Sequence, residues 1–187
     1  MLWAPRRSES PAHIMLSRAT RYLARHEPRT DWRLHIKSSA GAFLGVLVVG
    51  GLSAWSGLPL LIAPLGPTAL LMFAQPEIAP SQPVAIFAGY FLGATFASIM
   101  EVAFPGSWWA AVLAVGLVML TMLMLRVTHP PAAAVPLVVY SSPIAPQVLF
   151  LVMLTACVVL TGLALAWHRI PPRVGYPRWS PAEPETP

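Results

Sequence analysis

The stretch RVTHPPAAAVPLVVY, residues 126–140, says most about the fold, because it places a cation, an imidazole and three prolines between long apolar runs. Proline lacks an N–H, and its ring clashes with the preceding helical turn. Pro131 is therefore suited to begin a helix, whereas Pro136 must bend or break one. Lipid cannot hydrogen-bond an interrupted backbone, so such a segment is tolerated only inside protein or beside a watery cavity. The stretch predicts a short half-helix inside a membrane bundle.

A second segment, GLPLLIAPLGPTALLMFAQPEIAPSQP at 57–83, follows the same plan. Pro67 corresponds to Pro131, 64 residues later, and the tripeptide Ile-Ala-Pro at 78–80 recurs 66 residues later at 144–146. The segment predicts a second Pro-broken half-helix. The shared spacing predicts an internal two-fold repeat, with chance similarity between two apolar segments as the alternative.

The composition is that of a membrane protein. Of the 187 residues, 56% are hydrophobic and only 10% are charged, compared with about 25% charged residues in ordinary soluble domains. Four apolar runs are long enough to cross a hydrocarbon core, which takes about 20 residues. They cover 38–57, 84–103, 108–126 and 147–168. We therefore expect an all-α polytopic membrane protein with four long transmembrane helices and two short Pro-broken segments.

Each long run carries small residues at four-residue spacing, and tryptophans fall at the ends of these runs. Small residues let helix backbones approach closely in lipid, and tryptophan prefers the membrane interface. Because the apolar region is short, one copy makes a small bundle, and we expect a homo-oligomer. The residues concerned are Gly41 and Gly45, Gly89, Gly93 and Ala97, Ala110 and Ala114, Gly162 and Ala166, with Trp32, Trp55, Trp108, Trp109 and Trp167 at the ends.

The charged residues flank the apolar region. Between Ser38 and Trp167, the only Asp, Glu, Lys or Arg residues are Glu77, Glu101 and Arg126. Eight of the twelve Lys and Arg residues lie in the N-terminal segment, and three arginines follow the last apolar run. This is the positive-inside pattern, which predicts a multi-pass protein of the cell inner membrane with both termini in the cytoplasm. The basic residues thus indicate a lipid bilayer, not nucleic acid, as the partner.

Three regions follow from this pattern. Residues 1–37 form a basic cytoplasmic segment, 38–168 a transmembrane domain, and 169–187 a Pro-rich tail that we expect to be disordered. Within the first region, 14–25 separates apolar and basic residues onto two faces. This fits a short helix on the anionic inner leaflet, and a partly disordered basic tail fits equally.

The half-helices have two possible topologies. If they dip into the membrane and return, the chain has four spans, the halves run in the same direction and Arg126 lies outside. If they cross, each half has three passes, the halves are inverted, Arg126 faces the cytoplasm and Glu101 lies outside. The positive-inside rule favours the crossing arrangement.

The half-helix starts are the candidate solute-binding region. Ionisable residues inside a membrane usually have a function, although Arg126 could equally extend to the interface and His129 could be a cap bonded to backbone carbonyls. Two half-helix N-termini that meet at the midplane would suit a small anion, unless the sequence at 66–68 is only a kinked connector. The expected binding residues are Gly66, Pro67, Thr68, Arg126, Thr128, His129, Pro130 and Pro131.

No catalytic constellation accompanies them. Glu77 and Glu101 lie near the ends of runs, where solvated turns are expected, and no metal-ligand spacing, phosphate loop or nucleophile motif is present in the sequence. We expect neither an enzyme nor a cofactor.

The sequence THPPA at 128–132, together with PLGPTALLMF at 64–73 and Gln82-Pro83, resembles the HPP family of bacterial and plastid integral membrane proteins. The resemblance runs from about Gly41 to Arg169. It implies a four-helix membrane protein, and some cyanobacterial and plant members are implicated in nitrite transport. An arginine, an asparagine and a histidine of the family pattern are replaced here by Val84, Ala85 and Tyr90.

These observations predict an integral membrane permease or channel for a small solute, such as the inorganic anion nitrite. The loss of three polar family residues puts the anion itself in question. The alternative is a non-transporting membrane subunit or sensor that binds a partner through its basic N-terminal segment.

Overall fold

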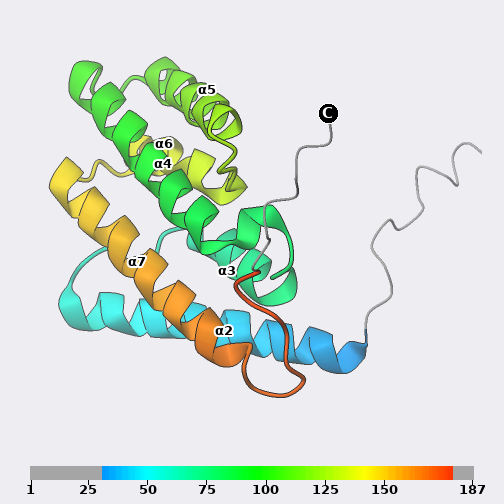
Figure 1. Ribbon diagram of the computed structural model, residues 1–187. Coiled ribbons are helices and arrows are strands. Elements are labelled where there is room, and N and C mark those ends of the chain that lie inside the picture. The colour runs from blue at the N-terminus through cyan, green and yellow to red at the C-terminus, as the bar shows by residue number, and fades with distance from the viewer. Residues whose placement is uncertain (1–30, 179–187) are drawn as a thin grey trace, which may run out of the picture. The chain divides into compact units, whose positions relative to one another are not determined.

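The computed structural model describes residues 31–178, and over this part of the chain every regular element is helical (Figure 1). The all-α prediction is therefore confirmed for the described residues. The predicted helix at 14–25 lies outside them. In chain order, the elements are α2 (Trp32–Ser56), α3 (Leu65–Ala74), the 3₁₀ segment η1 (Ala79–Ser81), α4 (Pro83–Ala103), α5 (Trp108–Met124), the 3₁₀ segment η2 (Pro130–Ala134), α6 (Val135–Ser141) and α7 (Pro146–Trp167).

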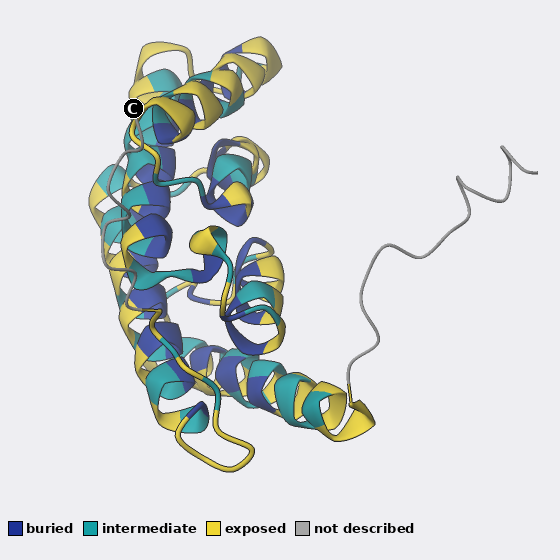
Figure 2. Ribbon diagram, turned by 45° about the vertical axis from the view of Figure 1, so that its right-hand side comes forward, coloured by how far each residue is buried: buried dark blue, intermediate teal, exposed yellow. Residues whose placement is uncertain are grey.

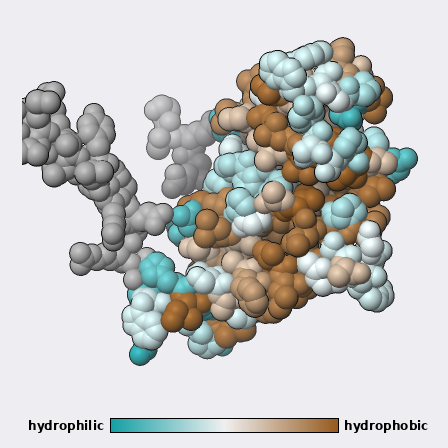
Figure 3. All heavy atoms as spheres, turned by 180° about the vertical axis from the view of Figure 1, so that it is seen from behind, coloured by the Kyte–Doolittle hydropathy of each residue, from teal (hydrophilic) through white to brown (hydrophobic). Residues whose placement is uncertain are grey.

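Three helices, α2, α4 and α7, are long and apolar enough to cross a membrane. The fourth predicted span is α5, an apolar helix of only 17 residues. At 1.5 Å per residue it reaches about 25 Å, less than a hydrocarbon core of about 30 Å. The prediction of four long helices is therefore not confirmed. Apolar side chains remain exposed on the described helices, and Figure 3 shows them across the middle of one face, as expected of a multi-pass membrane protein.

Helix α5 ends at a cap formed by Arg126. The residue has a φ of 57°, in the left-handed region. The Val127 N–H donates to the Met122 carbonyl at 3.0 Å, and the Arg126 N–H donates to the Leu123 carbonyl at 3.2 Å. This pair of bonds is a Schellman motif, in which glycine is the usual left-handed residue. The side chain of Arg126 is exposed.

The two Pro-rich segments form the expected short helices, which we call the half-helices: α3, and η2 continued by α6. In the second half-helix, the break expected from proline is a change from 3₁₀-helix to α-helix. Residues 130–134 are 3₁₀, and α6 starts at Val135 with Pro136 in its first turn. The N–H that Pro136 lacks is not needed at this position. Pro67 likewise lies in the first turn of α3.

Glycines on α4 bring the second half-helix against it. A Cβ added at Gly89 would lie 2.9 Å from the His129 Cβ, and one at Gly93 would lie 2.6 Å from the Ala132 carbonyl oxygen. Gly41 on α2 plays the same part against Phe73 and Trp167. Figure 2 shows buried residues along the inner faces of the long helices and on the short segments beside them. The predicted stripe on α7 differs, because Gly162 and Ala166 are exposed.

The contacts define two ends of the helical bundle. At one end, the start of α2 meets the ends of α3 and α7, since Trp167 Nε1 donates to the Lys37 carbonyl and His168 Nε2 lies 2.9 Å from the Met72 carbonyl. At the other end, the last turn of α4 packs beside the start of α5 and the middle of α6. The residues there include Glu101, Ser107, Ala110, Pro136 and Val139.

Residues 169–178, the C-terminal strap, fold back over the first of these ends. The Lys37 ammonium donates to the carbonyls of Ile170 and Pro172, both at 2.6 Å. The Tyr176 hydroxyl donates to the Ser81 carbonyl at 2.9 Å. The sequence predicted a disordered tail from Arg169 onward. Instead, these ten residues are held mainly through backbone carbonyls, which no side-chain pattern reveals.

Candidate functional site

Thr68 joins the two half-helices. It lies in the first turn of α3, and its side chain is fully buried. Its Oγ1 lies 2.9 Å from His129 Nε2, 2.7 Å from the Tyr90 hydroxyl oxygen and 3.0 Å from the Pro64 carbonyl oxygen. We call Thr68, Tyr90 and His129 the polar cluster. All three side chains are at most 1% exposed.

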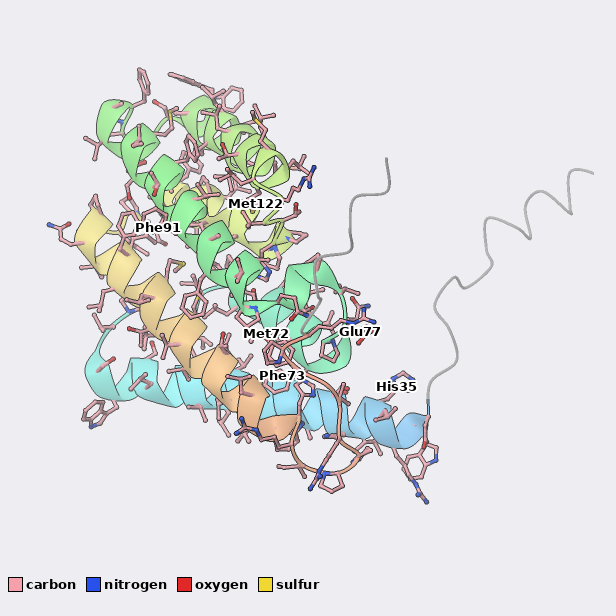
Figure 4. The ribbon with its side chains drawn as sticks, viewed as in Figure 1. His35, Met72, Phe73, Glu77, Phe91 and Met122 are labelled. Atoms are coloured by element: carbon pink, nitrogen blue, oxygen red, sulfur yellow. The ribbon has the colours of Figure 1, made fainter. Side chains whose placement is uncertain are left out.

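His129 is held at both ring nitrogens. It precedes η2 in an extended conformation, with φ −129° and ψ 94°. Its Nδ1 lies 2.7 Å from the Pro80 carbonyl oxygen, which can only accept, so Nδ1 is the donor. A neutral imidazole then has a lone pair at Nε2, which faces the Thr68 hydroxyl. The His129 backbone N–H points at the sulfur of Met122, labelled in Figure 4, at 3.5 Å.

The hydrogen positions that satisfy every group form one chain. The Tyr90 hydroxyl donates to Thr68, the Thr68 hydroxyl donates to His129 Nε2, and His129 Nδ1–H donates to the Pro80 carbonyl. Such connected bonds are stronger than isolated ones in an apolar interior, and an unpaired member would be costly. These hydrogen bonds link α3, η1, α4 and the start of η2.

Two apolar hollows touch the polar cluster. The α4–α7 cavity, of about 440 Å³, is lined by Tyr90 with Phe87, Phe91, Phe150 and Cys157. The half-helix groove, of about 390 Å³, is lined by Pro64, Pro67 and Pro131. The cluster reaches the first hollow through the Tyr90 ring and the second through Pro64, whose carbonyl faces Thr68.

The chain matches the model of one protein family, described as HPP, transmembrane region, over residues 27–177. It belongs to the HPP transmembrane family. No curated protein and no solved structure matches the chain. The matched region of the HPP family includes nearly all of the C-terminal strap, so the strap is part of the family domain and not an appendage.

The expected anion site at the half-helix starts lacks free donors. In α3, the N–H groups of Leu65, Gly66 and Thr68 donate to carbonyls of residues 62–64, and Pro67 has no N–H. In η2, Pro130 and Pro131 have none, and the Ala132 N–H donates to the His129 carbonyl. The first-turn groups that usually hold an anion at a helix start are thus absent or already bonded.

Of the residues expected at the site, the structure brings Thr68 and His129 into hydrogen-bond contact. Pro67 and Pro131 line the adjoining groove. Four others do not join the cluster: Gly66, Arg126 and Pro130 are exposed, and Thr128 is half-buried. Glu77 and Glu101 lie at opposite ends of α4, and Glu101 accepts a weak bond from the Gly106 N–H at 3.4 Å in the turn after that helix.

Tyr90 is the residue that sequence reasoning missed. It occupies the position of a histidine in the HPP family pattern, and its replacement suggested a lost donor. The structure shows that the tyrosine supplies a hydroxyl donor from α4 at this place, 2.7 Å from Thr68. Its ring centroid lies 5.3 Å from that of His129. The sequence signal for Tyr90 was its place in the HPP family pattern, because a polar residue at this position lies where α4 faces the half-helices.

Proposed function

We propose that this protein is a permease for a small solute, with the polar cluster as its gate. The observation that supports this most directly is the Thr68 hydroxyl, which ties together both half-helices and α4 at a fully buried point. Interrupted helices with buried polar groups near the middle of a bundle are the usual construction of transporter sites. A purely structural bundle would not need an ionisable residue there.

The two hollows support the same proposal. Binding sites for small molecules are mostly apolar cavities of about 300–1,000 Å³ with a few polar groups. Here Tyr90 lines the α4–α7 cavity, and Pro64, whose carbonyl faces Thr68, lines the half-helix groove. In this proposal, the closed cluster separates the two hollows. Opening would require α3, α4 and η2 to separate at Thr68. Such a motion would let a solute pass from one hollow to the other.

We further propose that the half-helices cross the membrane and that the two halves are inverted. The second half-helix runs alongside α4 in the same direction, since Gly89 lies at His129 and Gly93 at Ala132 and Val135. Helix α7 packs on α2 and α3 as α4 packs on α5 and α6. This pairing is what a two-fold repeat of three passes would produce.

Charge supports an orientation for this topology. Lys37 contacts the C-terminal strap, which carries Arg173 and Arg178, at the end of the bundle where α2 begins. Glu101 lies in the last turn of α4, at the opposite end. By the positive-inside rule, the strap end faces the cytoplasm of an inner-membrane protein. Labelling of single cysteines at positions 77, 101 and 126, in a Cys157→Ala background, tests this: positions 77 and 126 should be labelled from the cytoplasmic side and position 101 from the outside, whereas half-helices that return would give the reverse.

The permease proposal is tested with purified protein in liposomes. Stopped-flow light scattering would follow swelling in sodium nitrite, sodium formate, urea and glycerol. At least one solute should enter faster than in protein-free liposomes, and Thr68→Val should abolish the difference. Thr95→Val is the matched control, because Thr95 on α4 bonds only to the Phe91 carbonyl of its own helix.

If none of these solutes enters faster than through lipid alone, the protein is not such a permease. If cluster variants leave function intact while deletion of residues 1–30 abolishes it, the partner-binding hypothesis replaces transport.

A further inference from the structure

The polar cluster offers an anion no fixed positive charge. The groups that face His129 are Thr68 from α3, the Pro80 carbonyl from η1, Tyr90 from α4 and Met122 from α5. From α7 the nearest titratable group is the Cys157 thiol, which shares the α4–α7 cavity with Tyr90. Among the described residues, no carboxylate, lysine or arginine makes a hydrogen bond to the cluster.

Charged groups elsewhere on these elements point away from it. Arg126, three residues before His129, is exposed at the end of α5. Glu77 is exposed in the turn before η1. With the half-helix N–H groups already bonded, the one positive charge that this buried site can supply is a proton on His129.

The neighbours of His129 can accept that proton without moving. In the neutral ring, Nε2 accepts the Thr68 hydroxyl proton. When Nε2 binds a proton from water, the imidazole becomes an imidazolium, and Nε2–H donates to Thr68 Oγ1 over the same 2.9 Å. The Thr68 hydroxyl then turns its proton to the Pro64 carbonyl, 3.0 Å away. Nδ1–H continues to donate to the Pro80 carbonyl, and the Tyr90 hydroxyl continues to donate to Thr68.

Pro64 therefore supplies the alternative acceptor that makes this exchange possible. The Thr68 hydroxyl has one proton to donate, and it has two acceptors within reach, the Pro64 carbonyl and His129 Nε2, together with one donor, Tyr90.

A buried imidazolium without a counter-ion is unstable, and so is a small anion in an apolar bundle. Together they neutralise each other, and the anion would replace Thr68 and Pro64 as acceptors, so that Nε2–H of the imidazolium and the hydroxyls of Thr68 and Tyr90 donate to it. We infer that His129 binds one proton together with one small monovalent anion of a weak acid, so that the permease carries them as an electroneutral pair. This inference rests on the proposed transport function and names its substrate class and its coupling ion.

Nitrite uptake into liposomes containing the whole protein tests the inference. Potassium and valinomycin would set the membrane potential, and a trapped pH dye would count protons. After subtraction of protein-free liposomes, the initial rate should rise about tenfold for each pH unit of external acidification, by mass action. It should not change with the potential, and about one proton should enter with each nitrite.

The glutamine in His129→Gln keeps hydrogen-bonding atoms but cannot bind a proton in the pH range of the assay. This variant should lose the pH response, whereas the matched variant His35→Gln, at an exposed histidine of α2, should keep it. Gel filtration in detergent checks that each variant is folded.

If His129→Gln does not fold, Tyr90→Phe carries the test, with Tyr140→Phe, at an exposed tyrosine of α6, as control. Removing one donor should raise the KM for nitrite roughly tenfold or more and leave the proton count unchanged.

The outcomes separate the two proposals. Nitrite uptake that follows the potential and ignores external pH overturns the coupling and leaves the permease standing, as does a full pH response in His129→Gln. If other solutes enter but nitrite does not, the anion class is wrong. If nothing enters, the coupling falls together with the permease.

Discussion

The two buried histidines of the described chain have opposite surroundings. His129 uses both ring nitrogens, at Thr68 and at the Pro80 carbonyl. His168 follows α7 and is 3% exposed. Its Nε2 donates to the Met72 carbonyl at 2.9 Å, but no hydrogen-bond partner reaches its Nδ1. His168 instead packs between the rings of Phe73 and Tyr176, with centroids 6.0 and 5.2 Å away.

Burial alone therefore does not identify a functional histidine. His168 holds two segments together: it fixes the end of α3 through one bond and supports the C-terminal strap through Tyr176. A protonated His168 gains no acceptor at Nδ1, whereas a protonated His129 meets a hydroxyl that can reverse its role. The first region is thus built for a neutral ring, and the second accommodates both forms.

The largest effect is expected from Thr68→Val, which breaks the His129 region. Valine keeps the shape but leaves the Tyr90 hydroxyl and His129 Nε2 buried without partners. Each unpaired group costs about 1–3 kcal/mol, although hydrogen bonds between membrane helices average about 0.6 kcal/mol. A loss of about 2–4 kcal/mol should appear as a lower unfolding temperature in detergent. Thr68→Ser, which keeps the hydroxyl, should recover most of it. Equal stability for Val and Ser would show that the chain of bonds contributes nothing.

Glycine contacts also differ between the two histidine regions, because each histidine lies beside a helix that packs through glycine. Alanine at Gly93 would approach the Ala132 carbonyl oxygen at 2.6 Å, and a half-helix backbone cannot move aside. Alanine at Gly41 would meet the Phe73 and Trp167 side chains at 2.5 Å, and side-chain atoms shift more readily than a backbone. Overpacking costs about 1–3 kcal/mol, so we expect Gly93→Ala at the upper end of this range and Gly41→Ala at the lower. Thermal unfolding measures both.

The control for these variants is Gly116→Ala, since a Cβ there meets nothing within 4 Å. It should be neutral or slightly stabilising, because alanine favours helix by about 1 kcal/mol over glycine. If Gly41→Ala were the more damaging change, the backbone contact at Gly93 would not be the tighter constraint.

Much of the His129 region could be predicted from the sequence, because its chemistry is local. Proline dictates where a helix begins, so the half-helix starts and the place of Pro136 follow from the residues themselves. Thr68 and His129 lie near the starts of the two half-helices, and the structure brings them within 2.9 Å. Tyr90 was missed because which face of α4 turns inward depends on packing through Gly89 and Gly93, not on the tyrosine.

Little of the His168 region could be predicted. The strap is held by carbonyls of Ile170, Pro172 and Ser81, and every residue type has a carbonyl. A Pro-rich, Arg-containing tail also has the composition of a disordered one. Arg126 shows a related limit: its charge in an apolar sequence fitted a site and an interface anchor equally, and no pattern revealed the left-handed backbone with which it ends α5.

The pH dependence of stability distinguishes the histidines at smaller magnitude. Burial lowers the pKa of His168, and the Lys37 ammonium lowers it further, against the opposing effects of the Met72 carbonyl and Glu77. The unfolded chain takes up this proton below a pH of about 6.5, and the folded protein only at lower pH. The free energy of unfolding should therefore fall as pH falls through this range. His168→Gln, which keeps a donor for Met72, should flatten that slope, whereas His35→Gln should not. An unchanged slope in His168→Gln would mean that His168 is protonated equally in both states.

The smallest effect is expected from a substitution of Arg126, at the end of α5 and three residues before His129. Helix α7 ends at His168 in a right-handed conformation, with φ −70° and ψ −14°, but α5 ends at Arg126 with a φ of 57°. A left-handed residue other than glycine costs about 1–2 kcal/mol. Glycine removes this cost, but it loses more conformational entropy on folding, which offsets part of the gain. Arg126→Gly should therefore raise the free energy of unfolding by less than about 1 kcal/mol. This would appear as a slightly higher unfolding temperature. It also removes the charge without disturbing the cap, so it separates the two roles of Arg126. Unchanged solute uptake would assign the residue to the helix end alone, whereas lost uptake in a more stable protein would return its charge to the solute path.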